Sequence, residues 1–208
     1  MEELLKKIEK LKNSEIKNLV DKRLNEFKEI DKKSSNEIFK ELCFCILTAN
    51  FNAEKCIKIQ KEIGEEFSTL TEPQLTKKLE NLGHRYPNTR AKYISDANNY
   101  KDKLKDIIKP SCTEYGIREW LVKNVKGIGY KEASHFLRNI GFTNLAIIDF
   151  HIIDILTRYK IIERPKTLTR KKYLEIESIL KKIAEKLNMN LAELDLYLWY
   201  LETGKILK

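Results

Sequence analysis

The pattern of apolar residues constrains the fold most, because nearly every segment repeats its apolar positions with the spacing of an α-helix. No segment alternates apolar and polar residues as a half-buried strand does. Thr71 and Gln74 stand at capping-box spacing before one helical stretch, and Gly83 follows that stretch as a stop signal. We therefore predict an all-α fold of about nine or ten helices joined by short links.

Further start and stop signals place the other helices. A long helix is predicted after the loop at residues 84–87, and its apolar positions continue to about Ile108. Gly141 is expected to end a helix that begins near residue 130. Four residues with short polar side chains precede apolar stretches and are predicted to be N-caps: Ser35, Asp149, Thr169 and Asn190.

The charge balance favours a polyanionic partner. The 208 residues carry a formal net charge of +9, although acidic residues are also plentiful. A basic excess on a folded protein indicates nucleic acid before a membrane surface. The alternative is a composition adapted to heat, in which Lys and Glu are both enriched. No apolar run is long enough to span a membrane and no signal-peptide pattern is present, so we expect a soluble, cytoplasmic protein.

The cysteines argue against a metal centre. Cys43 and Cys45 lie in an apolar run, where burial as small hydrophobic side chains is the favoured interpretation. The sequence contains no CxxC pair, and no cysteine follows Cys112. We therefore expect no metal ligands, no iron–sulfur cluster and no required cofactor.

Gly127-Ile-Gly129 lies between two amphipathic helical stretches and predicts a hairpin at about residues 114–140. Glycine permits positive φ angles and close approach of the backbone, so the N–H groups of Gly127 and Gly129 can face a phosphate. The helix that begins at Tyr130 would direct the positive end of its dipole toward the same place. An ordinary corner between two helices remains the alternative.

Lys131 and Asp149 are the candidate catalytic pair. A cation in the first turn of a helix is unfavourable with the helix dipole, so local electrostatics alone would not select Lys131. Desolvation or a nearby positive potential lowers a lysine pKa, and the neutral amine can then attack carbon and form a Schiff base. Asp149 follows an apolar run and is expected to begin a helix as an ionised carboxylate, either as a plain N-cap or as the electrostatic partner of the amine.

These motifs together resemble the helix-hairpin-helix DNA glycosylase superfamily, in particular the bifunctional branch that carries a catalytic lysine. Gly127-Ile-Gly129-Tyr-Lys131 and the apolar run into Asp149-Phe-His151 carry the resemblance. Upstream, Leu47-Thr-Ala-Asn50-Phe-Asn52 resembles the helix end that enters the duplex. The stretch Gly83-His-Arg85-Tyr-Pro-Asn-Thr-Arg90 resembles the loop on the DNA-facing side.

Within the superfamily, the chain is most similar to the compact, chiefly archaeal class of 8-oxoguanine DNA glycosylase/AP lyase. Residues 131–139 and 199–208 carry this closer likeness, and the absence of a C-terminal cysteine cluster weighs against the endonuclease III and adenine-glycosylase branches. The class implies two helical lobes on either side of a DNA-binding cleft. We expect residues 36–142 to form the central lobe with the hairpin, and residues 1–35 plus 143–208 to form the other.

The resemblance also implies a function and its residues. The expected activity is base-excision repair: removal of 8-oxoguanine from double-stranded DNA through a Lys131 Schiff base assisted by Asp149, followed by strand cleavage through β-elimination. It implies a monovalent cation bound by hairpin carbonyls, and we expect a monomer. Asn50 would fill the space left by the extruded base, Arg85 or Arg90 would contact the opposite strand or the backbone, and His151 would contact phosphate. The candidates for recognition of the damaged base are Lys208, Trp199 and His135.

Four of these side chains also have a plainer interpretation, and that of Lys208 is the chance end of a lysine-rich tail. Trp199 can be part of an apolar core, His135 can pack between helices, and His151 can be an exposed helical histidine. Two alternative functions stay open. One keeps the fold and mechanism but acts on oxidised pyrimidines, and the other is a non-catalytic DNA-binding module that needs neither Lys131 nor Asp149.

Overall fold

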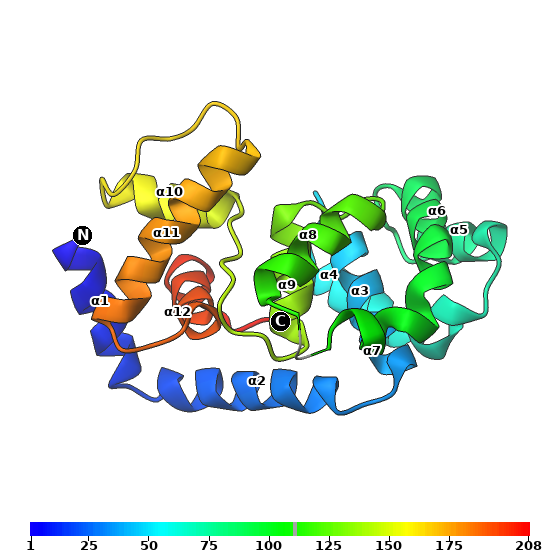
Figure 1. Cartoon of the computed structure of the whole chain (residues 1–208), viewed down its shortest axis with the longest axis horizontal. Coiled ribbons are helices and arrows are strands. Elements are labelled where there is room, and N and C mark those ends of the chain that lie inside the picture. Colours follow the sequence, from blue (N-terminus) through cyan, green and yellow to red (C-terminus); the bar gives the residue numbers. More distant parts are fainter. Residues whose placement is uncertain (110–111) are drawn as a thin grey trace. The chain divides into compact units, whose positions relative to one another are not determined.

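The computed structural model describes residues 1–109 and 112–208. Within these residues the chain forms twelve α-helices and two short 3-10 helices, η1 and η2, and no strand (Figure 1). The predicted all-α fold is thus confirmed. In the described part of the chain, no helix has the length and apolar character needed to cross a membrane.

The helices group into two compact units. One unit comprises Met1–Glu29 with Leu137–Lys208, and the other comprises Ile30–Phe136. Both boundaries fall inside helices, namely α2 (Ile16–Asp31) and α9 (Tyr130–Asn139). The division expected from the sequence instead follows the polar stretch before residue 36 and the stop at Gly141.

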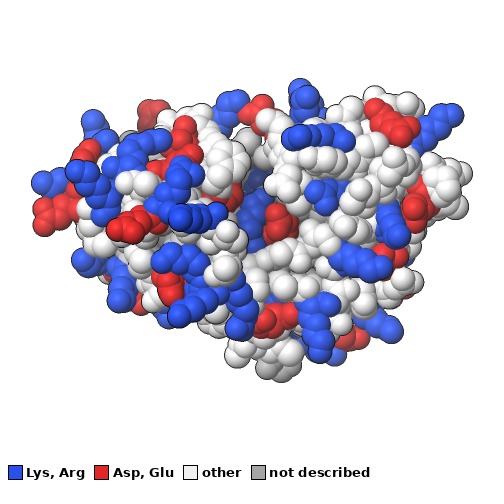
Figure 2. Space-filling view, turned by 90° about the horizontal axis from the view of Figure 1, so that it is seen from above, with Lys and Arg blue, Asp and Glu red and all other residues white. Residues whose placement is uncertain are grey.

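Charged side chains of both signs cover the outer faces of the helices. Figure 2 shows Lys and Arg side chains spread over the face in view, with Asp and Glu side chains between them. Many of the opposite charges meet as exposed pairs one helical turn apart, such as Lys7 with Glu3 at 3.1 Å. Pairs of this kind contribute little to stability, so the charges matter more for solubility and for polyanionic partners.

The Ile30–Phe136 unit is built around α3 (Ser35–Thr48). Every residue of α3 from 41 to 48 is buried, because the helix packs against α4, α6, α7 and both 3-10 helices. Figure 1 shows α5 and α6 side by side in the same unit. Its other elements are α4 (Ala53–Ile63), η1 (Gly64–Ser68), α5 (Glu72–Asn81), α6 (Pro87–Ala97), η2 (Asn98–Lys103), α7 (Leu104–Ile107), α8 (Glu114–Asn124) and the first part of α9.

The prediction of one continuous helix to about Ile108 was wrong. The chain instead forms α6, η2 and α7 in succession. Asn98 and Asn99 lie at the change from α to 3-10 geometry, and their side-chain amides donate to the carbonyls of Ser68 and Asp96 at 3.3 and 3.0 Å. Asparagine is unfavourable in helix interiors because its side chain competes in this way for hydrogen bonds with backbone groups.

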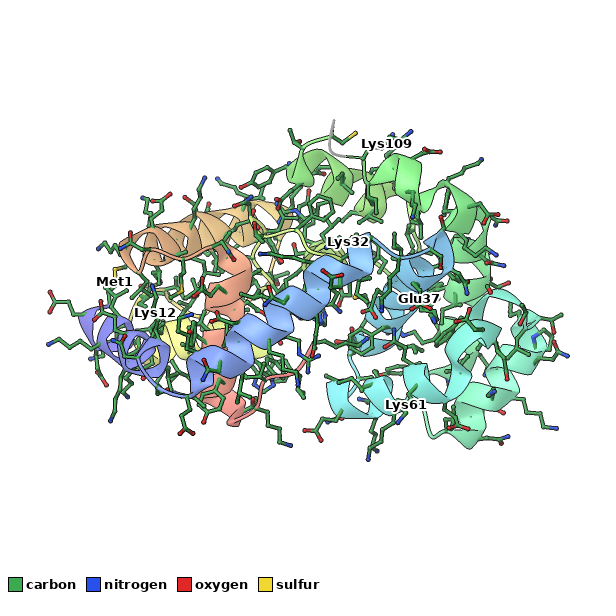
Figure 3. All side chains as sticks on the ribbon, turned by 90° about the horizontal axis from the view of Figure 1, so that it is seen from below. Met1, Lys12, Lys32, Glu37, Lys61 and Lys109 are labelled. Atoms are coloured by element: carbon green, nitrogen blue, oxygen red, sulfur yellow. The ribbon has the colours of Figure 1, made fainter. Side chains whose placement is uncertain are left out.

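The other unit is organised around α12 (Leu191–Thr203), which packs against α1, α10 and α11 (Figure 1). Lys12, labelled in Figure 3 at the end of α1, donates to the carbonyl of Leu187 at 2.7 Å. A buried ion pair of Arg138 and Asp195, 2.8 Å apart, ties the end of α9 to α12. The unit's remaining helices are α1 (Glu2–Lys12), α10 (Phe150–Arg158) and α11 (Arg170–Lys186), with most of α2.

Most helix starts lie where the sequence predicts them. Thr169 Oγ1 and Asn190 Oδ1 accept hydrogen bonds from backbone N–H groups three residues later, as N-caps do. The prediction for Ser35 was wrong by one residue, because Ser34 provides the cap and accepts from Glu37 N at 3.3 Å. Adjacent serines offer the same hydroxyl, and the extended backbone of residue 34 decides between them.

Candidate catalytic and DNA-binding site

The predicted hairpin is present between α8 and α9. Helix α8 ends at Asn124, α9 begins at Tyr130, and Ile128 is buried between the two glycines. Gly127 has a φ of +79°, and a Cβ at this position would lie 2.3 Å from Cδ2 of Tyr93. A residue with a side chain would therefore meet both backbone strain and a clash, so the hairpin requires glycine here.

Gly129 lies just before the first turn of α9. Its N–H donates to Oε2 of Glu132 at 3.3 Å, in the manner of a helix N-terminal cap. The unpaired N–H groups of a helix start and the helix dipole together favour an anion at this position. In the free protein the Glu132 carboxylate supplies that negative charge, and a DNA phosphate is the same kind of partner.

Lys131 projects from the first turn of α9, with its side chain 22% exposed. Its Nζ lies 3.9 Å from Oε1 of Glu132. Burial raises the pKa of the Cys56 thiol to about 12, against the opposing positive charges of Lys131 and Arg90. The amine thus lies in a partly enclosed position beside the Glu132 carboxylate and near Cys56 and Arg90.

Asn50 lies exposed in the turn after α3, with a φ of 57°. Arg85 is also exposed, and its guanidinium carbon lies 5.1 Å from the ring centre of Tyr86. Arg90 differs from both, since it is only 7% exposed and its Nη2 donates to the carbonyl of Ala49 at 2.5 Å. Of the two arginines proposed for DNA contact, Arg85 therefore has the accessible side chain.

His135 lies on α9, one turn after Lys131. The side chain is 6% exposed, and its ring meets the ring of Phe44 edge to face, with the centres 5.6 Å apart. The structure thus places His135 against α3, as in the plainer interpretation of a histidine packed between helices. Its expected part in base recognition stays a prediction.

Asp149 belongs to the other unit, where it is the N-cap of α10. Its Oδ1 accepts a hydrogen bond from Ile152 N at 3.0 Å. The preceding segment, Leu145 to Ile148, is buried without being helical. The carboxylate therefore lies where a buried, non-helical segment meets the N-terminus of α10.

Two residues that the sequence did not single out fix this extended segment. Glu177 Oε2 accepts from Ala146 N at 2.9 Å, and the Tyr173 hydroxyl donates to Ala146 O at 2.7 Å. Ile148 N donates to the same hydroxyl at 3.2 Å. A buried backbone outside a helix needs such partners. The available signal was Glu177 on the otherwise apolar face of α11, one turn after Tyr173.

The remaining candidates also lie in the unit that contains Asp149. The His151 ring meets the Trp199 ring edge to face at 4.9 Å, and the Phe150 ring, 63% exposed, lies 3.9 Å from His151. Trp199 is half-buried on α12, and Lys208 is partly exposed at the end of the chain. These aromatic side chains form one cluster at the start of α10.

The candidate residues are thus divided between the units. The Ile30–Phe136 unit contains Lys131, the hairpin glycines, His135 and the DNA-contact candidates Asn50, Arg85 and Arg90, and the other unit contains Asp149, His151, Trp199 and Lys208. Among residues 1–109 and 112–208, no group of three or more His, Cys, Asp or Glu side chains is arranged to bind a metal ion.

Comparison with known proteins points to one family. A family model described as 8-oxoguanine DNA glycosylase matches residues 20–189. The chain is 59% identical over 206 residues to the 8-oxoguanine DNA glycosylase/AP lyase of Methanocaldococcus jannaschii. The matched region covers 99% of each protein. It is 52% identical to the protein of the same description from Korarchaeum cryptofilum, over 100% of this chain and 99% of that protein. A crystal structure of the M. jannaschii enzyme with a 15mer DNA containing 8-oxoguanine has a TM-score of 0.96 at 59% identity and covers 99% of both chains.

Proposed function

The chain belongs to the 8-oxoguanine DNA glycosylase family, and on that premise we propose that it removes 8-oxoguanine from double-stranded DNA and then cuts the strand as an AP lyase. The observation that carries this proposal is the similarity of the chain, over 99% of both chains, to a relative whose crystal structure contains DNA with 8-oxoguanine. The hairpin with Gly127 at positive φ, followed at once by a lysine in the first turn of α9, supports it locally.

Lys131 is the proposed nucleophile. An enzyme of this kind extrudes the damaged nucleotide, because the sugar cannot be reached inside the stacked duplex. The neutral amine attacks C1′, the N-glycosidic bond breaks, and the base leaves with the bonding electron pair and takes up a proton. The sugar ring then opens to a C1′ imine with Lys131. Loss of a proton from C2′ and departure of the 3′ phosphate complete the β-elimination.

Asp149 is the proposed electrostatic partner. Positive charge develops on the sugar as the base departs, and a fixed carboxylate stabilises that charge without reorganisation. The N-cap hydrogen bond from Ile152 N holds the Asp149 carboxylate in a fixed orientation. The hairpin N–H groups are proposed to bind phosphate, a contact that positions DNA without reading its sequence. Asn50 and Arg85 are the proposed duplex contacts, and the aromatic cluster with Trp199 is proposed to face the extruded base.

The decisive experiment is covalent trapping. Borohydride reduces the imine to a stable amine, so the parent protein should give a protein–DNA adduct with a duplex containing 8-oxoguanine. Lys131→Gln should give none. Lys126→Gln is the matched control in the same hairpin, since its ammonium is paired with Asp96 at 2.9 Å, and it should trap at the parental level.

Other outcomes would contradict particular parts of the proposal. An adduct that persists in Lys131→Gln places the nucleophile elsewhere, and failure of the parent protein to trap any lesion supports the non-catalytic module. A panel of duplexes that differ only in the lesion separates 8-oxoguanine from oxidised pyrimidines. A monomeric state, a monovalent cation at the hairpin and the absence of a required cofactor are further parts of the proposal. Light scattering tests the first, and assays with and without potassium and chelator test the others.

A further inference from the structure

The end of α3 is closed by two side chains from a distant part of the sequence. The last carbonyls of a helix have no intrahelical donors and need partners when they are buried. The His84 ring bonds through Nε2 to the Leu47 carbonyl at 3.1 Å, and Arg90 Nη2 donates to the Ala49 carbonyl at 2.5 Å. Both side chains are buried, at 4% and 7% exposure. The turn with Asn50 follows directly.

His84 has a second bond on its opposite edge. Its Nδ1 accepts from the backbone N–H of Tyr86 at 3.1 Å. Only the neutral ring with its proton on Nε2 can donate to Leu47 O and accept from Tyr86 N at once. Burial lowers the pKa of His84, and the nearby charge of Arg90 acts in the same direction, which is consistent with the neutral form.

One imidazole therefore joins two exposed segments. On one side is the turn of Asn50, and on the other are Arg85 and Tyr86, all three exposed. The Phe51 ring contacts the imidazole at a tilt of 44°, with the ring centres 4.3 Å apart. Because Phe51 follows Asn50 in the chain, this contact also holds the turn on the C-terminal side of Asn50. The last turn of α3, which leads into the Asn50 turn, and the backbone of Tyr86 are thus both bonded to a single buried ring.

Arg90 extends the same support toward the hairpin. Its guanidinium carbon lies 5.8 Å from the centre of the Tyr86 ring and 5.9 Å from that of Tyr93. The Tyr93 ring in turn fills the space beside Gly127, where a Cβ would clash with it. The Asn50 turn, the Arg85–Tyr86 segment and the hairpin are therefore connected within one unit.

We propose that His84 is a positioning residue that sets the spacing between Asn50 and the Arg85–Tyr86 segment, so that both enter the duplex together when the damaged base is extruded. Arg90 supports the same arrangement by closing the Asn50 turn. This role rests on the proposed function. It concerns extrusion from the duplex and leaves the chemistry of Lys131 unaffected.

Two near-isosteric substitutions separate the two bonds. His84→Gln places an amide donor near the Nε2 position and removes the acceptor for Tyr86, whereas His84→Asn places an oxygen near Nδ1 and removes the donor to Leu47. We expect each to lower the rate of 8-oxoguanine excision from duplex DNA by about 10-fold, and His84→Ala by more, because buried partners lose their hydrogen bonds. Borohydride trapping on a single-stranded abasic oligonucleotide, which needs no extrusion, should stay within about twofold of the parent.

A spectroscopic measurement reports extrusion directly. With 2-aminopurine beside the lesion, the parent protein should give the fluorescence increase of an unstacked base, and the His84 variants should give a smaller one. Thr113→Ala is the matched control, because it removes the N-cap bond to Gly116 N at 3.1 Å in the same unit but far along the chain from this turn. It should lower thermal stability and leave the fluorescence increase unchanged.

The outcomes distinguish the two proposals. Loss of trapping on the single-stranded abasic substrate in the His84 variants, with the fold intact by circular dichroism, contradicts a positioning role. Parental excision and fluorescence in both His84→Gln and His84→Asn also overturn it. Failure of the parent protein to trap any substrate instead rejects the proposed function itself.

Discussion

At the scale of single residues, the Asp149 carboxylate accepts a hydrogen bond from Ile152 N at 3.0 Å and so caps α10. The sequence left two interpretations of this residue open, a plain N-cap and the electrostatic partner of the amine. The structure confirms the cap. A cap needs only an oxygen acceptor, whereas stabilisation of a sugar cation needs negative charge, so the two tasks can be separated by substitution.

Asp149→Asn should lower the excision rate by about 100-fold or more while leaving duplex affinity and stability close to those of the parent. Asparagine caps helices about as well as aspartate, so only the charge is lost. Single-turnover kinetics, a binding titration and thermal unfolding measure the three quantities.

Two alanine substitutions, one at Asp149 and one at a second cap, serve as controls for this result. Asp149→Ala should lose the cap as well, at a cost of about 1 kcal/mol in stability. Thr169→Ala removes the corresponding cap of α11 and should cost a similar amount without affecting excision. A large loss of duplex affinity in Asp149→Asn would instead make Asp149 a structural residue.

At the scale of elements, the hairpin was predictable because its signals are local. Gly127 and Gly129 lie between two apolar helical patterns, and Gly141 ends α9 with a φ of +97° as expected. The contact between Gly127 and Tyr93 could not be predicted, because it depends on how α6 packs against the hairpin. Likewise, the interruption of α6 at Asn98 reflects a side-chain bond to Ser68, 30 residues away.

Gly127→Ala should therefore destabilise the protein more than Gly83→Ala. Both glycines have positive φ, at +79° and +72°, but only Gly127 has a neighbour in the space of a Cβ. The left-handed conformation costs about 1–2 kcal/mol in either case, and overlap with Tyr93 adds about 1–3 kcal/mol at Gly127.

Urea unfolding of the two variants measures this difference. Adding Tyr93→Ala to Gly127→Ala should recover part of the overlap cost, because the ring that a Cβ would meet is then absent. Equal destabilisation by Gly83→Ala and Gly127→Ala would mean that the Tyr93 ring moves aside freely.

At the scale of the whole molecule, the net charge of +9 is spread over a surface that also carries many acidic groups. The sequence left open whether this excess marks a polyanionic partner or adaptation to heat. Membership of a DNA glycosylase family favours the first. The two explanations predict different responses to salt, since phosphate contacts release counterions and surface ion pairs affect mainly stability.

Affinity for duplex DNA should fall steeply and linearly on a double-logarithmic plot against salt concentration. A protein that contacts roughly four phosphates loses about 100-fold in affinity between about 50 and 200 mM salt. Fluorescence anisotropy with a labelled duplex measures the slope, and thermal unfolding at the same salt concentrations verifies that the protein stays folded. A flat response would leave the basic excess without a role in binding.

Features that depend on neighbours along the chain could be predicted from the sequence: the helical faces, most N-caps, the hairpin glycines, and the lysine and aspartate expected at two helix starts. The pairing of buried polar groups, in contrast, depends on how distant helices pack. His84 bonds to a carbonyl 37 residues away, Arg90 to one 41 residues away, and Glu177 to an amide 31 residues away. A helix end or an extended buried segment leaves backbone groups that require partners. Which side chain supplies them depends on the packing of distant helices, and local sequence patterns do not predict that packing.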